Sequence, residues 1–276
     1  MATKVIALDA GHGLRTSGKQ TPNGIKEWSL NDAVRDKVVA RLKDYDVKFV
    51  FPDNNEGITD ESLANRRAMY VSKGVDAMVS IHHNANTGNW NSATGVEVFT
   101  DRNPIAKDKT LANCIYPRLV KYTGLKGRGI KEEDWYVINQ DKIPAVLVEG
   151  GFMDGSKDYK VITSEAGKDA YARAVAEGLI EFLGLKKKTA TTTSATTSTN
   201  KTTATTGSKV PFKVRVDITN LCVRKGPGTN YAKTGKHTGR GVFTITETKS
   251  GKGSTAGWGK LKSGAGWISL DYAKRV

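Results

Sequence analysis

Histidine and cysteine are scarce in this chain of 276 residues, which holds four histidines and two cysteines. The cysteines, Cys114 and Cys222, lack a partner at the close spacing of a zinc knuckle or a redox pair, so we expect both to be unpaired. No apolar run is long enough to span a membrane, and residues 1–4 lead into an apolar run without the parts of a secretory signal peptide. We therefore expect synthesis in the cytoplasm, no membrane insertion, and release by another factor if the protein acts outside the cell.

Acidic residues are scarce only in the last part of the chain. Basic and acidic residues number 25 and 25 in residues 1–185, 5 and 0 in residues 186–209, and 13 and 3 in residues 210–276. Residues 186–209 consist mainly of threonine, alanine and serine and cannot bury enough apolar surface to fold, so we predict a flexible linker. The basic residues 210–276 favour a polyanionic partner, which could be nucleic acid, anionic lipid or an anionic cell-wall polymer.

Two different patterns flank the predicted linker. In residues 1–185, apolar strands alternate with amphipathic helices, which predicts an α/β domain with a mostly parallel twisted sheet flanked by helices. The expected strands cover residues 5–8, 47–51, 77–81, 95–100 and 144–148, and the expected helices begin near residues 27, 60–62, 104 and 165. In residues 210–276, short apolar runs separated by glycines predict a small all-β barrel of about five to seven strands.

Three of the four histidines follow two of the expected strands. His12 lies between two glycines after the first strand, and His82 and His83 end another. Catalytic zinc sites commonly use two histidines and a carboxylate, with a fourth position left for water. His12, His82 and Glu27, at the start of a helix, supply this set from one edge of the sheet, and Glu149 ends a further strand there as a free carboxylate suited to general-base work. The alternatives are a structural His12, a helix-capping Glu27 and a buried structural Glu149.

These segments resemble zinc-dependent N-acetylmuramoyl-L-alanine amidases of the amidase-3 type, including phage endolysins and bacterial autolysins. The resemblance rests on Glu27 and on residues 9–13, 80–85, 95–99, 128–130 and 144–152, and it extends over about residues 3–184. It implies zinc ligands at His12, Glu27 and His82 and a catalytic carboxylate at Glu149. The implied reaction cleaves the amide between the lactyl group of N-acetylmuramic acid and L-alanine with a zinc-activated water, whose proton Glu149 accepts and passes to the leaving amine.

For several residues near these motifs, the sequence indicates a role less specifically. His82 is favoured over the adjacent His83 because neighbouring strand residues point to opposite sides. Arg66 matches a family arginine and is expected to support the site without taking part in catalysis, and Asp9 is expected to orient the His12 ring. Trp135 and Tyr136 either line the substrate groove or pack in the core.

The last part of the chain resembles bacterial SH3-like domains, which bind cell walls. The resemblance rests on residues 221–231, 257–261 and 266–268. It implies a structural Arg224 and a turn formed by residues 226–228, while Tyr231 and Trp258 are either binding residues or core. His237 has no partner that would suggest a site.

Together these features predict a modular peptidoglycan hydrolase of the phage endolysin kind. It would stay in the host cytoplasm until its release to the cell wall at lysis. Its partners would be bacterial peptidoglycan and a wall polymer bound by the basic domain, with no nucleic acid; the oligomeric state is not predicted. Two other hypotheses stay open: a zinc endopeptidase that cuts the peptide cross-bridge, and a non-catalytic cell-wall-binding protein.

Overall fold

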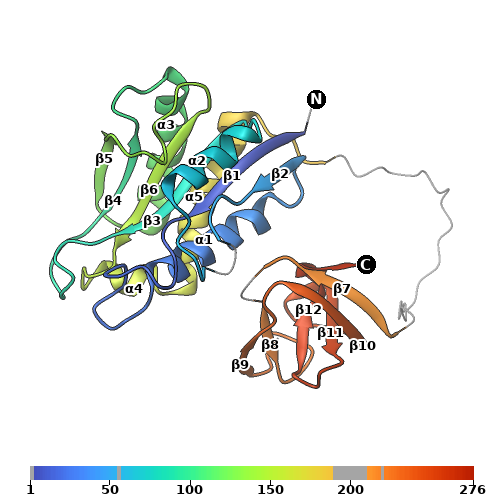
Figure 1. Ribbon diagram of the computed structural model, residues 1–276. Coiled ribbons are helices and arrows are strands. Elements are labelled where there is room, and N and C mark those ends of the chain that lie inside the picture. Colours follow the sequence, from blue (N-terminus) through green and yellow to red (C-terminus); the bar gives the residue numbers. More distant parts are fainter. Residues whose placement is uncertain (1–2, 55–56, 189–209, 219–220) are drawn as a thin grey trace. The chain divides into compact units, whose positions relative to one another are not determined.

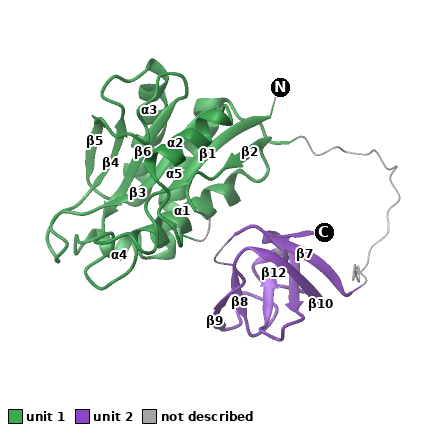
Figure 2. Cartoon of the chain, viewed as in Figure 1, with its two compact units in different colours: residues 1–189 green, residues 190–276 purple. Residues whose placement is uncertain are grey.

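The chain divides into two compact units, residues 1–189 and residues 190–276 (Figure 2). The computed structural model describes residues 3–54, 57–188, 210–218 and 221–276. Most of the predicted linker, residues 186–209, lies outside the described residues. Its first three residues belong to the first unit, because Lys187 forms a β-bridge with Tyr45 and the backbone N–H of Lys188 donates to the carbonyl of Asp44.

The first unit is built on a six-stranded sheet in the order β2-β1-β3-β6-β4-β5 (Figure 1). Its strands are β1 (Lys4–Ala10), β2 (Val47–Val50), β3 (Ala77–Asn84), β4 (Val96–Thr100), β5 (Gly127–Glu132) and β6 (Ala145–Phe152). Four of the five pairings are parallel, as expected for a mostly parallel sheet, and the antiparallel pairing of β4 with β6 makes the sheet mixed. Because β1, β3 and β6 are adjacent and parallel, their carboxyl ends meet at one edge, where ligand sites gather in such sheets.

Helices cover both faces of this sheet. The helices are α1 (Glu27–Leu42), α2 (Leu63–Ser72), α3 (Ala106–Thr123), α4 (Asp158–Ile162) and α5 (Glu165–Leu183). Alternate strand residues point to opposite faces: Ile6 joins the core shared with α1, α3 and α5, whereas Ala7 joins a smaller core with Tyr70 of α2. The face that packs against α1, α3 and α5 therefore carries the larger core, and the face that packs against α2 carries the smaller one.

The helix boundaries follow local capping chemistry. Ser62 precedes α2, and its hydroxyl accepts a hydrogen bond from the backbone N–H of Asn65, which confirms the predicted start. Gly124 and Gly184 end α3 and α5 in the left-handed region, at φ of 67° and 59°. The sequence analysis missed β5 and α4, both of which are short.

The second unit is a seven-stranded antiparallel sheet in the order β13-β7-β10-β11-β12-β8-β9. Its strands are β7 (Phe212–Val216), β8 (Cys222–Arg224), β9 (Lys233–His237), β10 (Gly241–Gly251), β11 (Ser254–Leu261), β12 (Trp267–Ser269) and β13 (Ala273–Arg275). Valine, isoleucine and leucine side chains fill its core. Trp258 is buried with them, while Tyr231 is 44% exposed, so of these two candidates only Tyr231 is accessible to a ligand.

Arg224 holds the turn that follows β8, as predicted. Its guanidinium donates to the carbonyls of Thr229 and Tyr231, at 3.1 Å and 2.8 Å. Cys114 is buried and Cys222 half-buried, and both are free thiols. No helix among the described residues combines the length and the apolarity that crossing a membrane requires.

Candidate metal centre

His12 occupies a strained turn directly after β1. Its φ of 64° is the one positive value at a non-glycine position among the described residues, and such outliers gather at functional sites. The preceding backbone is held by the N–H of Gly11, which donates to the carbonyl of Ile81 in β3. A Cβ on Gly11 would lie 2.0 Å from Cε1 of His82, so glycine is required there because the His82 ring passes over it.

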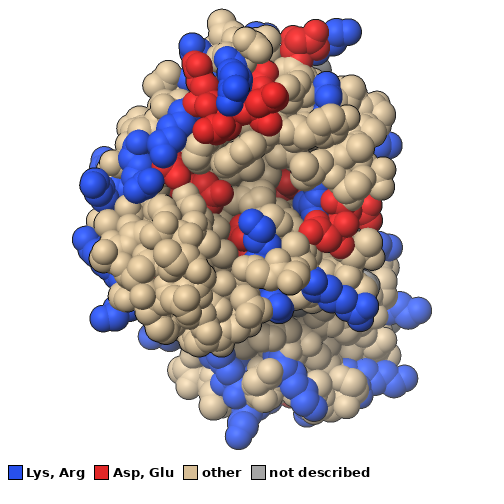
Figure 3. Space-filling model, turned by 60° about the vertical axis from the view of Figure 1, so that its left-hand side comes forward, with Lys and Arg blue, Asp and Glu red and all other residues tan. Residues whose placement is uncertain are grey.

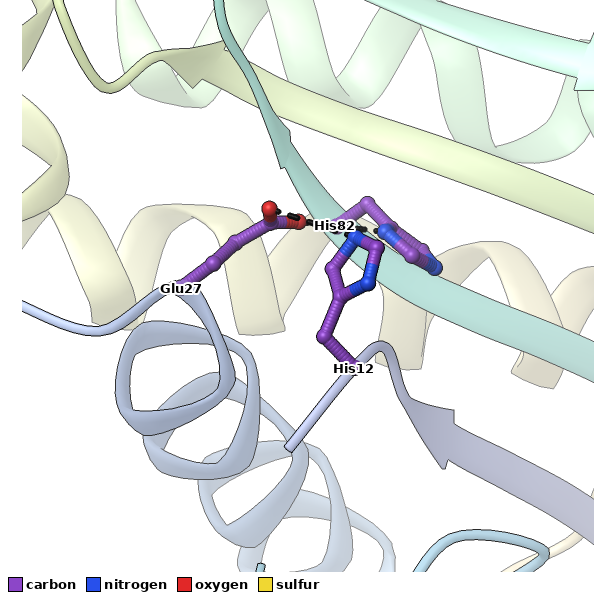
Figure 4. A group of neighbouring side chains, drawn as sticks. All are labelled: His12, Glu27 and His82. Atoms are coloured by element: carbon purple, nitrogen blue, oxygen red, sulfur yellow. Dashed lines mark hydrogen bonds and ion pairs between the residues drawn. The ribbon is translucent and has the colours of Figure 1, made fainter. Parts of the chain in front are cut away.

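Glu27 stands between the two histidines. It is the first residue of α1, and its backbone N–H donates to the carbonyl of Lys19. Its Oε1 lies 3.1 Å from Nδ1 of His82, and its Oε2 lies 3.3 Å from Nε2 of His12. One potential ligand atom from each of the three residues lies within 4.8 Å of the others, and the side chains converge from a turn, a helix start and a strand (Figure 4).

The neighbouring His83 points away from this group. Its Nδ1 lies 2.7 Å from Oδ1 of Asn31, and its ring packs against Tyr171 with ring centroids 5.5 Å apart. It contributes only its backbone N–H, which donates to Glu27. His82 rather than His83 therefore reaches the site. Asn31 also donates to the carbonyl of Gly11, and this hydrogen bond holds the His12 turn against α1.

The charges of the group suit a divalent cation at neutral pH. Burial raises the pKa of Glu27, but the hydrogen bond with His82 and the charges of His82 and His12 outweigh this effect and lower the pKa to about 2. Burial lowers the pKa of His12 to about 4, although the charge of Glu27 opposes it. The site thus offers an ionised carboxylate and a neutral His12 imidazole, the protonation states that metal binding requires.

Arg66 ties the His12 turn to the sheet. Its buried guanidinium donates to the carbonyls of Ala10 and His12 and to the carboxylates of Asp9 and Asp60. Asp9 in turn accepts a hydrogen bond from Ser80. We expected Asp9 to help orient the His12 ring, and the link between the two residues runs through Arg66, which hydrogen-bonds the Asp9 carboxylate and the His12 carbonyl. Arg66 has the supporting position that we predicted for it.

Glu149 lies beside this group on β6. It is in register with His82 of β3 on one side and with Glu97 of β4 on the other, so the three side chains form a row on one face of the sheet. Burial, followed by the charges of Glu27 and Glu97, raises the pKa of Glu149 well above its usual range. Its Oε2 is buried without a hydrogen-bond partner among the described residues. Such a carboxyl group is suited to accept and return a proton.

The group of three and Glu149 line a pocket of about 380 Å³. One face of the molecule is hollowed, with acidic and basic side chains adjoining there (Figure 3). Trp135 lines this pocket and packs against Phe99 with ring centroids 4.3 Å apart. Tyr136 does not line it, and instead lies under the guanidinium of Arg67 beside a different pocket.

Several residues that shape the pocket were not predicted from the sequence. Asn31 lies four residues after Glu27 and therefore on the same side of α1, so helical spacing could have identified it. Glu97, Lys131 and Lys19 also line the pocket. The strand alternation of residues 96–100 places Glu97 opposite the apolar core face, but the direction of β4 had to be known before Glu97 could be paired with Glu149.

The first unit matches known amidases. A family model described as N-acetylmuramoyl-L-alanine amidase, Amidase_3, matches residues 6–181. The chain is 32% identical over 180 residues to N-acetylmuramoyl-L-alanine amidase LytC of Bacillus subtilis, covering 65% of this chain and 35% of LytC. It is 33% identical over 189 residues to the endolysin of Bacillus phage SPP1, covering 67% and 68% of the two chains.

A solved amidase structure also resembles the first unit. The N-acetylmuramoyl-L-alanine amidase from Clostridium difficile 630 aligns with a TM-score of 0.62 and 27% identity, over 67% of this chain and 98% of that one. The matched region contains the six-stranded sheet apart from the first two residues of β1, and it includes the His12, Glu27 and His82 group. The chain therefore belongs to the Amidase_3 family of N-acetylmuramoyl-L-alanine amidases.

Proposed function

We propose that this chain is a zinc-dependent peptidoglycan hydrolase that cleaves the amide between N-acetylmuramic acid and L-alanine. The convergence of His12, Glu27 and His82 beside the buried Glu149 carries this proposal. The names of its relatives LytC and the SPP1 endolysin support the substrate and the role in lysis. Because the match covers only 35% of LytC, the activity of that whole protein does not transfer by similarity alone.

Zinc fits the donor set. Two histidines and one carboxylate are a common ligand set of catalytic zinc, and ligands about 2.1 Å from a tetrahedral ion stand about 3.4 Å from one another. Oε1 of Glu27 lies 3.1 Å from Nδ1 of His82, Oε2 lies 3.3 Å from Nε2 of His12, and one ligand atom from each of the three residues lies within 4.8 Å of the others, so small side-chain movements would bring the set around one ion. We propose that His12, Glu27 and His82 hold the ion. When bound, zinc supplies Lewis-acid polarisation of a carbonyl and makes water acidic enough to lose a proton near neutral pH.

The chain's own residues would position the reaction and move the proton. Glu149, in register with His82, is proposed to take the proton of the attacking water and deliver it to the leaving nitrogen of L-alanine. Its raised pKa supports the second half of this task, because a carboxyl group with high proton affinity retains the proton until the amine departs. Arg66 and Asn31 keep the His12 turn in place.

The second unit is proposed to be an SH3-like domain that binds the cell wall. Its seven-stranded antiparallel sheet and its excess of basic over acidic residues support this assignment. An anionic wall polymer is the proposed partner, and the exposed Tyr231 is the accessible aromatic candidate. Binding by this unit would raise the concentration of the first unit at its substrate. Similarity to the SPP1 endolysin supports release to the wall at lysis.

Mass spectrometry of the fragments released from purified peptidoglycan tests the activity. The amidase releases peptides that begin with L-alanine and leaves glycan whose lactyl group ends in a free carboxyl. Chelation should stop the release, and added zinc should restore it. Fragments cut within the peptide would instead support the endopeptidase hypothesis, and an absence of fragments would leave a wall-binding protein.

A further inference from the structure

Two basic side chains share one buried carboxylate at the far end of the row formed by His82, Glu149 and Glu97. Glu97 is only 2% exposed. Its Oε1 accepts a hydrogen bond from the amide of Asn84 at 2.6 Å. Its Oε2 accepts from Nε of Arg128 at 2.9 Å and also from Nζ of Lys131. One cation would already balance the charge of Glu97. The group of Glu97, Arg128 and Lys131 therefore carries one positive charge in excess.

Lys131 brings this excess charge to the pocket, whose lining does not include Arg128. The side chains of Arg128 and Lys131 are 34% and 39% exposed, and Lys131 lines the pocket together with Glu149. The Arg128 guanidinium binds Glu97 through Nε, and its Cζ lies 4.9 Å from the centre of the Phe152 ring. Glu133 is the other carboxylate on this side of the pocket, and it pairs with Arg102 at 3.5 Å rather than with Lys131. Glu149 is the remaining carboxylate beside this group, and among the described residues no ion pair joins either Glu149 or Glu133 to Arg128 or Lys131.

The position of these cations fits a substrate carboxylate. Adjacent strands lie about 4.8 Å apart and rise about 3.3 Å per residue, so the backbone of Glu97 on β4 lies about 5 Å from that of Glu149 on β6. Lys131 on β5 is in register with Phe99, two residues along from Glu97, so its backbone lies about 12 Å from that of Glu149 and only its long side chain reaches toward it. In a stem peptide the residue after L-alanine is an isoglutamate, whose α-carboxylate stays free unless it is amidated. That carboxylate lies about 7 Å beyond the scissile nitrogen, two residue lengths of about 3.5 Å each.

We propose that Arg128 and Lys131 bind the free α-carboxylate of the second stem-peptide residue and make the chain selective for non-amidated peptidoglycan. This inference rests on the proposed amidase function and names its substrate more closely. Glu97 is then a positioning residue, because it holds both cations in place while its own charge balances only one. An amidated substrate would keep one acceptor oxygen but would present an NH2 donor in place of the other and would carry no negative charge, so it would lose one hydrogen bond and the ion pair.

A matched pair of substrates tests the proposal: a muramoyl peptide that ends in L-alanyl-D-isoglutamate, and its isoglutamine counterpart. The full zinc-loaded chain should cleave the acid with kcat/KM roughly 10- to 100-fold higher than the amide, as expected for losing a hydrogen bond to a charged group. Lys131→Met and Arg128→Met should bring this ratio close to one, because they should raise KM for the acid more than KM for the amide. Each variant leaves Glu97 one cation and Asn84.

Two further variants separate binding from a merely structural role. Lys131→Arg keeps the charge and should keep the preference for the acid. Lys126→Met removes an exposed charge from the segment just before β5, outside the pocket, and should change nothing. A wild-type ratio near one, or a ratio unchanged in both methionine variants, would overturn the proposal. Failure of the wild-type chain to cleave either substrate would instead overturn the amidase function on which the proposal rests.

Discussion

Replacing Arg66 with methionine should lower the unfolding free energy of the first unit by about 3–5 kcal/mol, the usual cost of removing one partner from a buried ion pair. The guanidinium is buried and donates to five oxygens, which belong to Asp9, Ala10, His12, Asp60 and Glu61. Methionine has a similar length but no donors, so the Asp9 carboxylate would stay buried without its cation. The His12 turn would lose its tie to α2 at the same time.

Arg67→Met is the matched control on the same helix. The Arg67 guanidinium lies 5.1 Å from the centre of the Tyr136 ring, a contact worth about 0.5–1 kcal/mol. Urea unfolding followed by helical circular dichroism measures the first unit, because the described α-helices all lie there. The two variants carry the same substitution at adjacent positions, so their difference isolates the buried network.

A double variant sharpens this test. Asp9→Asn with Arg66→Met removes both charges, so its loss should be smaller than the sum of the two single losses. Equal losses for Arg66→Met and Arg67→Met would refute the reasoning, because they would mean that the buried contacts of Arg66 contribute nothing specific.

The remaining predictions concern catalysis, acid stability and wall binding. Glu149→Gln should slow the clearing of cell-wall suspensions by roughly 10²–10⁴-fold while leaving zinc content unchanged, and retained lysis would contradict its role. Burial raises the pKa of Asp154, but hydrogen bonds from the backbone of residues 86–88 outweigh this effect and lower the pKa. The ionised Asp154 should therefore stabilise the fold fully above the unfolded pKa of about 3.9, and this contribution should be lost as pH falls through the lower folded pKa. The difference in unfolding free energy between wild type and Asp154→Asn, measured by urea unfolding, should shrink below about pH 4. Residues 210–276 alone should pellet with purified cell walls at low salt and less at high salt, whereas failure to pellet at low salt would count against a wall-binding role.

The sequence predicts the order of the main elements because their apolar periodicity is strong. The strand before His12, the helix after Glu27 and the strand before His82 all occur where the pattern places them. In a parallel sheet the carboxyl ends of β1, β3 and β6 meet at one edge, so the sequence alone was enough to group His12, His82 and Glu149. Adjacent side chains on a strand diverge, and this separates His82 from His83.

Other features depend on contacts that no local pattern carries. β5 (Gly127–Glu132) contains two glycines and few apolar residues, and α4 (Asp158–Ile162) is a single short turn of helix, so neither shows a clear period. The antiparallel direction of β4 is a property of the whole sheet. Since that direction places Glu97 beside Glu149, the cation pair at Arg128 and Lys131 becomes visible only in three dimensions.

Metal analysis of the purified full chain tests the central claim most directly, because the proposed chemistry depends on one zinc held by His12, Glu27 and His82. After equilibration with zinc and removal of excess, the wild-type chain should retain one ion per molecule. His82→Ala should retain none, whereas His237→Ala, which removes an exposed histidine of the second unit, should retain it fully. Wild-type zinc content and affinity in His82→Ala would contradict the account.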